Sequence, residues 1–331
     1  MLEHGGNLQA AVTRYGIPRD AWIDLSTGIN PHAYPVPALA ADAWHRLPED
    51  SEVLLSAARD YYGAPRLIAV AGSQAAIQGL PQLRTRHAPA SRVVVAEPSY
   101  AEHAHQWRRA GHAVRAVAHA DLADAVADCD VMVVCNPNNP TGETVAPATL
   151  LQWAAQLAAH GGWLIVDEAF GDVVPEWSVA SMADRTGLIV LRSVGKFFGL
   201  AGLRLGFVVA EQALLDALAE QLGPWSVSGP AQEIGVLALR DHAWQETTRA
   251  NLRAQGQRLH AMLNGFGFPA RGCDLFQYWS QPNPATLADH LAAHGIWIRR
   301  FAHGVRLGLP AHEDEWQKLQ AVLAAWKDEK E

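Results

Sequence analysis

The chain has 331 residues, which is more than one compact core usually contains, so a large and a small domain are expected. Its formal net charge of -8 argues against nucleic acid or an anionic membrane surface as a partner. The first residues lack the apolar core of a secretory signal, no apolar run is long enough to span a bilayer, and the three cysteines have no metal or redox spacing, so we expect a cytoplasmic protein.

Short apolar runs alternate with helical patterns up to about residue 212. The runs fall at residues 67–71, 92–96, 131–135, 163–166, 188–191 and 205–210, and helices are expected near 75–83, 100–110 and 147–160. This alternation predicts an α/β fold built from βαβ units with a mainly parallel central sheet. Because several runs are apolar on both faces, we expect the sheet to lie between two layers of helices.

The pattern changes after residue 212. Helices are predicted at 211–221, 231–264 and 312–327, with short strands at 275–280, 296–299 and 305–309. These elements predict a smaller α+β domain. The expected organisation is therefore an N-terminal arm or small-domain segment over residues 1–30, a large domain over 31–212 and a small C-terminal domain over 213–331.

Polar groups follow several of the predicted strands, and ligands of open α/β sheets bind at the carboxyl ends of strands. Ser73 and Gln74 open a helix after the first run, where free backbone N–H groups suit a phosphate, although Ser73 could simply cap the helix. The string NPNNPTG, residues 136–142, forms a rigid turn that could aim an amide into a cleft. Asp167 ends another run, and its carboxylate could pair with a protonated ring nitrogen, bind a metal or cap a helix.

Lys196 is the only lysine before residue 318, because three of the four lysines of the chain lie in the C-terminal stretch. It follows a buried strand and precedes two phenylalanines, so partial desolvation favours its neutral, nucleophilic amine. Ser193 lies three residues before it and Arg204 eight residues after it, and both side chains could donate hydrogen bonds to a phosphate.

Together these residues resemble the fold-type I pyridoxal-phosphate (PLP) enzymes, in particular the branch that contains the histidinol-phosphate aminotransferases. The spacing Ser-x-x-Lys-x7-Arg, the NPNNPTG string and Asp-Glu-Ala-Phe occur in the family's order. The resemblance implies a homodimer that binds PLP, with Lys196 as the catalytic Schiff-base lysine. The cofactor-binding residues that it implies are Ser73, Gln74, Tyr100, Asn139, Asp167, Ser193, Lys196 and Arg204.

Phe170 departs from the family pattern. Many relatives carry tyrosine at this place, and the tyrosine hydroxyl bonds the oxygen on the cofactor ring. Phenylalanine has no hydroxyl, so the electronic state of the ring is expected to differ from that in a simple aminotransferase.

Two N-terminal strings narrow the resemblance to the L-threonine-O-3-phosphate decarboxylases of cobalamin synthesis. These are His4-Gly5-Gly6-Asn7 and the segment 24–31, DLSTGINP. The group binds a small phosphorylated amino acid, so Arg306 is expected to meet its carboxylate and Arg299 its phosphate. The implied substrate-binding residues are His4, Gly5, Gly6, Asn30, Asn139, Arg299 and Arg306. For His4 the alternative is a frayed terminal residue.

Two other functions stay open at this point. A histidinol-phosphate aminotransferase would use the same residues and differ only in which bond at Cα is aligned for cleavage. A catalytically silent PLP-fold protein is the third possibility, although the complete set of Lys196, Asp167 and Arg204 argues against it. No metal site is predicted, because the closely spaced pairs His290/His294 and His103/His105 lack an apparent third ligand.

Overall fold

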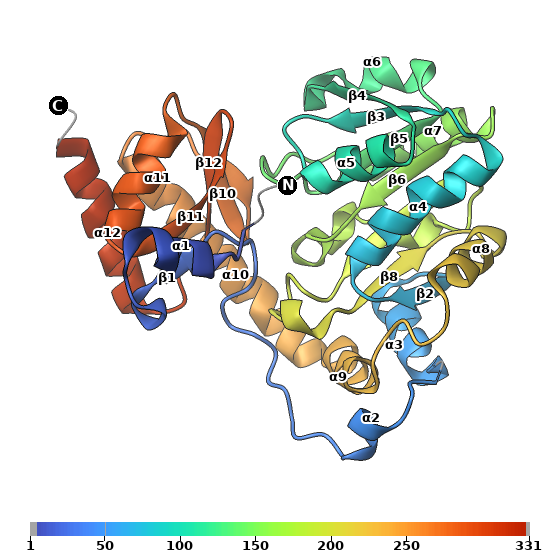
Figure 1. The fold of residues 1–331 in the computed structure, drawn as a ribbon, viewed down its shortest axis with the longest axis horizontal. Helices are drawn as coiled ribbons and strands as arrows, with labels where there is room; N and C mark the ends of the chain where they lie inside the picture. Colours follow the sequence, from blue (N-terminus) through green and yellow to red (C-terminus); the bar gives the residue numbers. More distant parts are fainter. Residues whose placement is uncertain (1–4, 50, 329–331) are drawn as a thin grey trace. The chain divides into compact units, whose positions relative to one another are not determined.

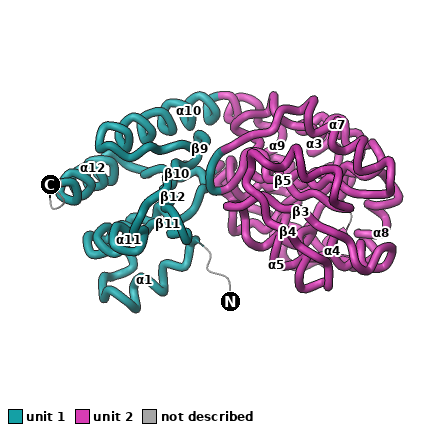
Figure 2. Tube along the Cα trace, turned by 90° about the horizontal axis from the view of Figure 1, so that it is seen from above, with its two compact units in different colours: residues 1–33, 140–142, 247–331 teal, residues 34–139, 143–246 magenta. Residues whose placement is uncertain are grey.

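The computed structural model describes residues 5–49 and 51–328. These residues pack into two compact units, which Figure 2 colours separately. Unit 1 takes in residues 1–33, 140–142 and 247–331 as far as they are described, and unit 2 takes in residues 34–139 and 143–246. Units are defined by packing alone, so the domain limits expected at residues 30 and 212 stay a prediction. Among the described residues, no helix combines the length and apolar character needed to cross a membrane.

Unit 2 is built on a seven-stranded sheet (Figure 1). In spatial order its strands are β2 (Leu67–Val70), β8 (Gly206–Val209), β7 (Leu188–Ser193), β6 (Trp163–Asp167), β5 (Val131–Cys135), β3 (Arg92–Ala96) and β4 (Ala113–Val117). Strand β8 runs antiparallel to both β2 and β7, and the other neighbouring pairs are parallel. The expected mainly parallel α/β sheet is therefore confirmed.

Helices cover this sheet because its central strands are mostly apolar. Every residue of β5, β7 and β8 is buried, as two-sided coverage requires. One hydrophobic core joins the sheet to α4 (Ser73–His87), α5 (Ala101–Arg109) and α8 (Gln212–Leu222). Helix α3 (Glu52–Tyr62) packs against β2 and α9 (Gly229–Arg240), and α7 (Pro147–Ala158) packs against β6. The short helices α2 (Asp42–His45) and α6 (Leu122–Ala125) complete the unit.

Two of the differences from the sequence prediction have a clear local cause. Strand β4 was not expected, because it is an edge strand whose residues are half-buried or exposed and therefore form no apolar run. The single helix predicted over 231–264 is two helices, α9 and α10 (His242–Gly265). Asp241 separates them, and its carboxylate accepts a hydrogen bond from the backbone N–H of Trp244 at 3.0 Å, as an N-cap does.

Unit 1 contains a five-stranded sheet with the order β1 (Ile23–Leu25), β11 (Ile296–Phe301), β12 (Gly304–Gly308), β10 (Phe276–Ser280) and β9 (Arg271–Cys273). The three predicted C-terminal strands are β10, β11 and β12. Strand β1 pairs in parallel with β11, which brings the N-terminal segment beside the C-terminal one. The helices of the unit are α1 (Leu8–Tyr15), α11 (Pro284–Ala293), α12 (Glu313–Asp328) and most of α10.

Candidate active site

A cavity of about 160 Å³ lies in unit 2. It contains all eight side chains that the sequence assigns to a cofactor, together with the departing residue Phe170. The full lining is Ser73, Gln74, Tyr100, Cys135, Asn139, Asp167, Ala169, Phe170, Ser193, Gly195, Lys196, Ala201 and Arg204. The structure therefore brings the predicted cofactor residues together, while their individual roles stay predictions.

The sheet topology explains why residues so distant in sequence meet here. Asp167 and Ser193 end the adjacent parallel strands β6 and β7, and Cys135 ends β5, so the three lie at one edge. Because β8 runs in the opposite direction, its first residue lies at that same edge. Arg204, two residues before β8, is thereby delivered to the ends of the parallel strands.

One end of the cavity is suited to an anion. Ser73 begins α4, where backbone N–H groups and the helix dipole favour negative charge. Gly72 precedes it with φ of 72°, and a Cβ at this position would lie 2.5 Å from a guanidinium nitrogen of Arg204. Glycine is therefore needed for the close approach of Arg204 to the helix N-terminus. Ser193 supplies a second hydroxyl, and the set fits a phosphate group.

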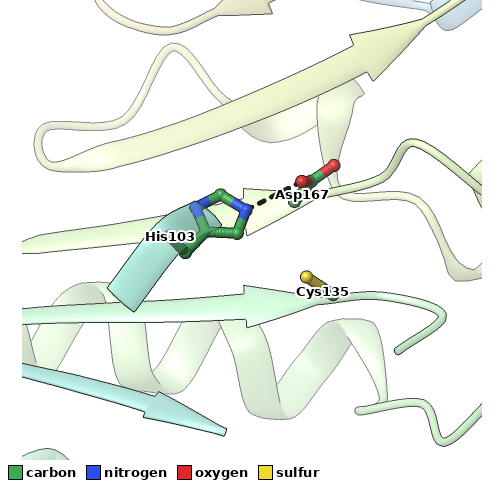
Figure 3. Close-up of side chains that lie close together, drawn as sticks. All are labelled: His103, Cys135 and Asp167. Atoms are coloured by element: carbon green, nitrogen blue, oxygen red, sulfur yellow. Dashed lines mark hydrogen bonds and ion pairs between the residues drawn. The ribbon is translucent and has the colours of Figure 1, made fainter. Parts of the chain in front are cut away.

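A second polar group in the cavity centres on Asp167 (Figure 3). The Nε2 atom of His103, on α5, lies 2.8 Å from the Oδ2 atom of Asp167, and both side chains are buried. In Figure 3, Cys135 lies below His103 and Asp167, and its sulfur points up toward them. The three donor atoms lie within 4.8 Å of one another, as in a metal site. However, His103 and Asp167 bond each other through atoms that a metal would need.

The charge state of His103 follows from its neighbours. Burial disfavours the imidazolium, but hydrogen bonds to Asp167 and Cys135 outweigh burial and raise the pKa of His103 to about 10. A protonated His103 keeps the buried Asp167 beside a positive charge. The sequence reading dismissed this histidine because it sought a metal ligand. Its ring also meets that of Tyr100, the residue before α5, edge to face at 6.0 Å between centroids.

Gln74 and Tyr100 are held by a short chain of hydrogen bonds. The Tyr100 hydroxyl donates to the Gln74 carbonyl oxygen at 3.2 Å, and the Gln74 amide donates to Glu102 at 2.9 Å. Burial, with Glu102 and Asp167 nearby, raises the pKa of Tyr100 to about 12, so its ring stays a neutral phenol. The Tyr100 ring is therefore fixed in place as an aromatic wall.

Lys196 lies in the turn that follows β7 and is half-buried. Its Nζ atom is 5.6 Å from the centroid of the Phe170 ring. An amine, a buried carboxylate, an anion-binding end and an aromatic wall are the groups that a phosphorylated pyridine aldehyde needs. The residues present therefore fit PLP.

The residues expected to bind substrate lie in unit 1, except Asn139, which lies in the cavity. Arg299 and Arg306 are directly opposite each other on β11 and β12. Arg306 also donates to the backbone oxygen of Ser26 at 2.8 Å, and the Ser26 hydroxyl accepts from the N–H of Gly6 at 2.8 Å. Unit 1 thus gathers part of this set around Ser26, whose own role the sequence reading missed. His4 lies outside the described residues.

Close packing explains two more of these positions. A Cβ on Gly5 would lie 2.3 Å from the backbone oxygen of Ser26, so no larger residue fits there. Asn30 is buried, and its side-chain oxygen accepts from the N–H of His32 at 2.9 Å. Burial, and then the neighbouring Arg299, lower the pKa of Arg306 to about 10. Two cations on facing positions of one sheet are an arrangement that favours an anionic ligand.

Comparisons with known proteins agree with this arrangement. Residues 23–318 match the family model for aminotransferase class I and II. The chain is 52% identical to a threonine-phosphate decarboxylase of Pseudomonas aeruginosa over 99% of both chains, and 45% identical to one of a Sinorhizobium species over 98% of both. The solved structure of histidinol-phosphate aminotransferase from Sinorhizobium meliloti in complex with pyridoxal-5'-phosphate covers 98% of this chain and 99% of its own, with a TM-score of 0.77 and 19% identity.

Proposed function

Because the chain belongs to the family of class I and II aminotransferases, we propose that it is a PLP-dependent threonine-phosphate decarboxylase within that family. It converts L-threonine O-3-phosphate to (R)-1-amino-2-propanol O-2-phosphate, a step of cobalamin biosynthesis. The observation that carries this proposal is 52% identity over 99% of the chain to a protein of that name. The cavity in unit 2 supports it, because it contains the amine, the carboxylate and the anion-binding end that PLP needs.

The cofactor, when bound, supplies an aldehyde that condenses with amines and a ring that accepts the electrons of a broken bond at Cα. Arg204, Ser73 and Ser193 would hold its phosphate, with Gln74 beside them in the lining. Asp167, which His103 contacts, would pair with the ring nitrogen, and Asn139 would donate to the ring hydroxyl oxygen. Tyr100 would pack against the ring.

Lys196 has two tasks in this scheme. Its amine would hold the aldehyde of the cofactor until the amino group of the substrate takes that place. Once displaced, the amine carries a proton close to Cα. In decarboxylation the carboxylate leaves as carbon dioxide, and Lys196 returns this proton to Cα. The carbon that bears the phosphate takes no part, so its configuration is retained as R.

The two arginines of unit 1 carry the charge that an anionic substrate needs. Arg306 binds the carboxylate and Arg299 the phosphate, helped by Gly5, Gly6 and Asn30. His4 would add a further donor. A transaminase must instead point the Cα–H bond along the ring's π system. The facing positions of Arg299 and Arg306 on β11 and β12 support a ligand with two anionic groups.

Incubating the PLP-loaded protein with threonine O-3-phosphate tests this function. We expect one carbon dioxide released for each substrate consumed, with no need for a 2-oxo acid. The matched reaction uses histidinol phosphate and 2-oxoglutarate, for which we expect no glutamate. Stoichiometric glutamate without carbon dioxide would instead establish an aminotransferase, and silence in both reactions with bound PLP would establish a non-catalytic protein.

The working form is a homodimer in the cytoplasm. Large apolar side chains stay exposed around α2 and α9 of unit 2 and support this assembly. Trp44 and Leu47 are each 66% exposed, Val53 is 55% exposed and Leu237 is 43% exposed. We name these four residues the apolar patch; Leu47, Val53 and Leu237 line one hollow of the surface. Several large apolar side chains exposed on neighbouring elements are typical of protein interfaces.

A further inference from the structure

A buried cluster of charged residues lies next in sequence to the cavity residues that end β6 and β7. The cluster consists of Arg192, Glu168 and Asp172, whose side chains are at most 3% exposed. An N–H group of the Arg192 guanidinium donates a hydrogen bond to Glu168, and another donates to Asp172 at 2.6 Å. None of the three lines the cavity, so the proposed chemistry does not use them.

Each of two members is the covalent neighbour of a cavity residue. Glu168 follows Asp167 at the end of β6, and Arg192 precedes Ser193 at the end of β7. Successive side chains of a strand point to opposite faces, so when Ser193 faces the cavity Arg192 faces away from it. The ion pair between Arg192 and Glu168 therefore joins the ends of β6 and β7. These ends carry Asp167, which is assigned to the ring nitrogen, and Ser193, which is assigned to the phosphate.

Glu168 also fixes the segment that carries Phe170. Its carboxylate accepts hydrogen bonds from the Ser178 hydroxyl at 2.5 Å and from the Val179 N–H at 2.8 Å. Asp172 lies in the same segment. Arg192 therefore contacts this segment twice, once at Glu168 and once at Asp172. A Cβ on Gly171 would lie 2.7 Å from a guanidinium nitrogen of Arg192, which shows how closely this backbone wraps around the cation.

Burial acts differently on two members of the cluster: it raises the pKa of the Glu168 carboxyl, whereas the Arg192 guanidinium stays charged. Burial opposes the guanidinium, but Asp172 and Glu168 raise the pKa of Arg192 above its ordinary range. The guanidinium also lies 4.4 Å from the ring centroid of Tyr62. A buried ion pair is a poor way to gain stability, because apolar residues of similar volume do as well or better, whereas it does specify one geometry.

We propose that Arg192, Glu168 and Asp172 are positioning residues that hold Asp167, Phe170 and Ser193 in the geometry that the cofactor requires. This inference rests on the PLP assignment made above. It assigns the cluster a role in cofactor affinity and cofactor environment, in addition to its role in folding.

The test compares wild-type protein with Glu168→Gln, Asp172→Asn and Arg192→Met. Glu168→Gln keeps the shape of the side chain but has one oxygen in place of two, so it cannot accept from both Ser178 and Val179 as the carboxylate does. Arg84→Met is the matched control, because Arg84 is also buried, donates to Ser91 at 3.0 Å and to the Gly161 oxygen at 2.7 Å, and is absent from the cavity lining. Each protein is stripped of cofactor and titrated with PLP, and its absorption spectrum and thermal midpoint are measured.

We expect Glu168→Gln to bind PLP about tenfold more weakly or worse and to shift the absorption band of the bound cofactor, in line with losses seen for residues that support ligand-holding side chains. Asp172→Asn should lose less, because its oxygen can still accept from Arg192. Arg84→Met should lower the thermal midpoint and leave PLP affinity and spectrum unchanged.

Two results would overturn the inference. One is a folded Glu168→Gln protein with wild-type PLP affinity and spectrum, and the other is an equal loss of affinity in Arg84→Met. If Arg192→Met does not fold, Glu168→Gln and Asp172→Asn decide the question. Wild-type protein that binds no PLP would overturn the proposed function itself, and this inference with it.

Discussion

Lys196 carries the chemistry at the scale of single residues. Replacing it with alanine removes the one amine that lines the cavity. We expect Lys196→Ala to retain PLP less firmly and to lose at least about 100-fold in decarboxylation rate, since general acid–base catalysis alone contributes about that much. Borohydride reduction followed by peptide mapping checks the attachment. Label on the peptide that contains Lys196 supports the assignment, whereas label elsewhere, or an unchanged rate in the variant, contradicts it.

His103 gives a second prediction, which concerns stability against pH. Its pKa is raised from 6.5 to about 10 in the folded protein, so the native state holds the proton more tightly than the unfolded chain. The stabilisation is complete below pH 6.5 and is lost as the pH rises through about 10. His103→Asn should therefore be less stable than wild type near pH 6, with the difference narrowing toward pH 10.

Denaturant unfolding at several pH values measures this difference. His105→Asn is the control, because His105 lies on the same helix but is exposed. Its free energy of unfolding should follow wild type at every pH. A gap between His103→Asn and wild type that stays constant from pH 6 to 10 would refute the charged state assigned to His103.

The sequence predicted the cavity residues well because each one belongs to a short local string with its own chemistry. Ser193, Lys196 and Arg204 lie within one connection, and Asp167 ends an apolar run. His103 could not be found in this way, because its importance depends on a contact with Asp167 across 64 positions of sequence. Ser26 was missed for the same reason, since its partner Arg306 is 280 positions away.

At the scale of elements, apolar runs predicted the strands that are buried on both faces. The edge strand β4 and the three-residue strands β1 and β9 escaped prediction, because they are exposed or too short to show a pattern. The break between α9 and α10 was missed because a single aspartate makes it. Turns therefore need the detailed chemistry of one or two residues, which periodicity does not report.

The turn at Gly142 allows a prediction of this kind. Gly142 has φ of 73°, and a Cβ there would lie 2.3 Å from the carbonyl carbon of Gly272. Gly161 also has φ of 73° but has open space around it. We expect Gly142→Ala to lose about 1–3 kcal/mol more in free energy of unfolding than Gly161→Ala, which is the usual cost of overpacking. Equal losses in urea unfolding would show that only the backbone angle matters.

At the scale of the whole molecule, the proposed homodimer makes the apolar patch a target for mutation. Trp44→Glu combined with Leu237→Lys places charges where an interface would exclude water. We expect wild type to have the mass of two chains by light scattering and the double variant to have the mass of one. Gln156→Glu, at an exposed position of α7, is the matched surface change and should stay dimeric. A monomeric wild type contradicts the proposal.

The reversed direction of β8 has a consequence for how the chain tolerates insertions. A parallel successor to β7 would require a long crossover, whereas an antiparallel one is joined by the residues between Ser193 and Gly206 alone. This hairpin-like link carries both Lys196 and Arg204. Its length must therefore suit the spacing of these two side chains as well as the pairing of the strands. Added residues there would move Lys196 away from Arg204, whereas the crossovers between parallel strands can lengthen on the surface without that effect.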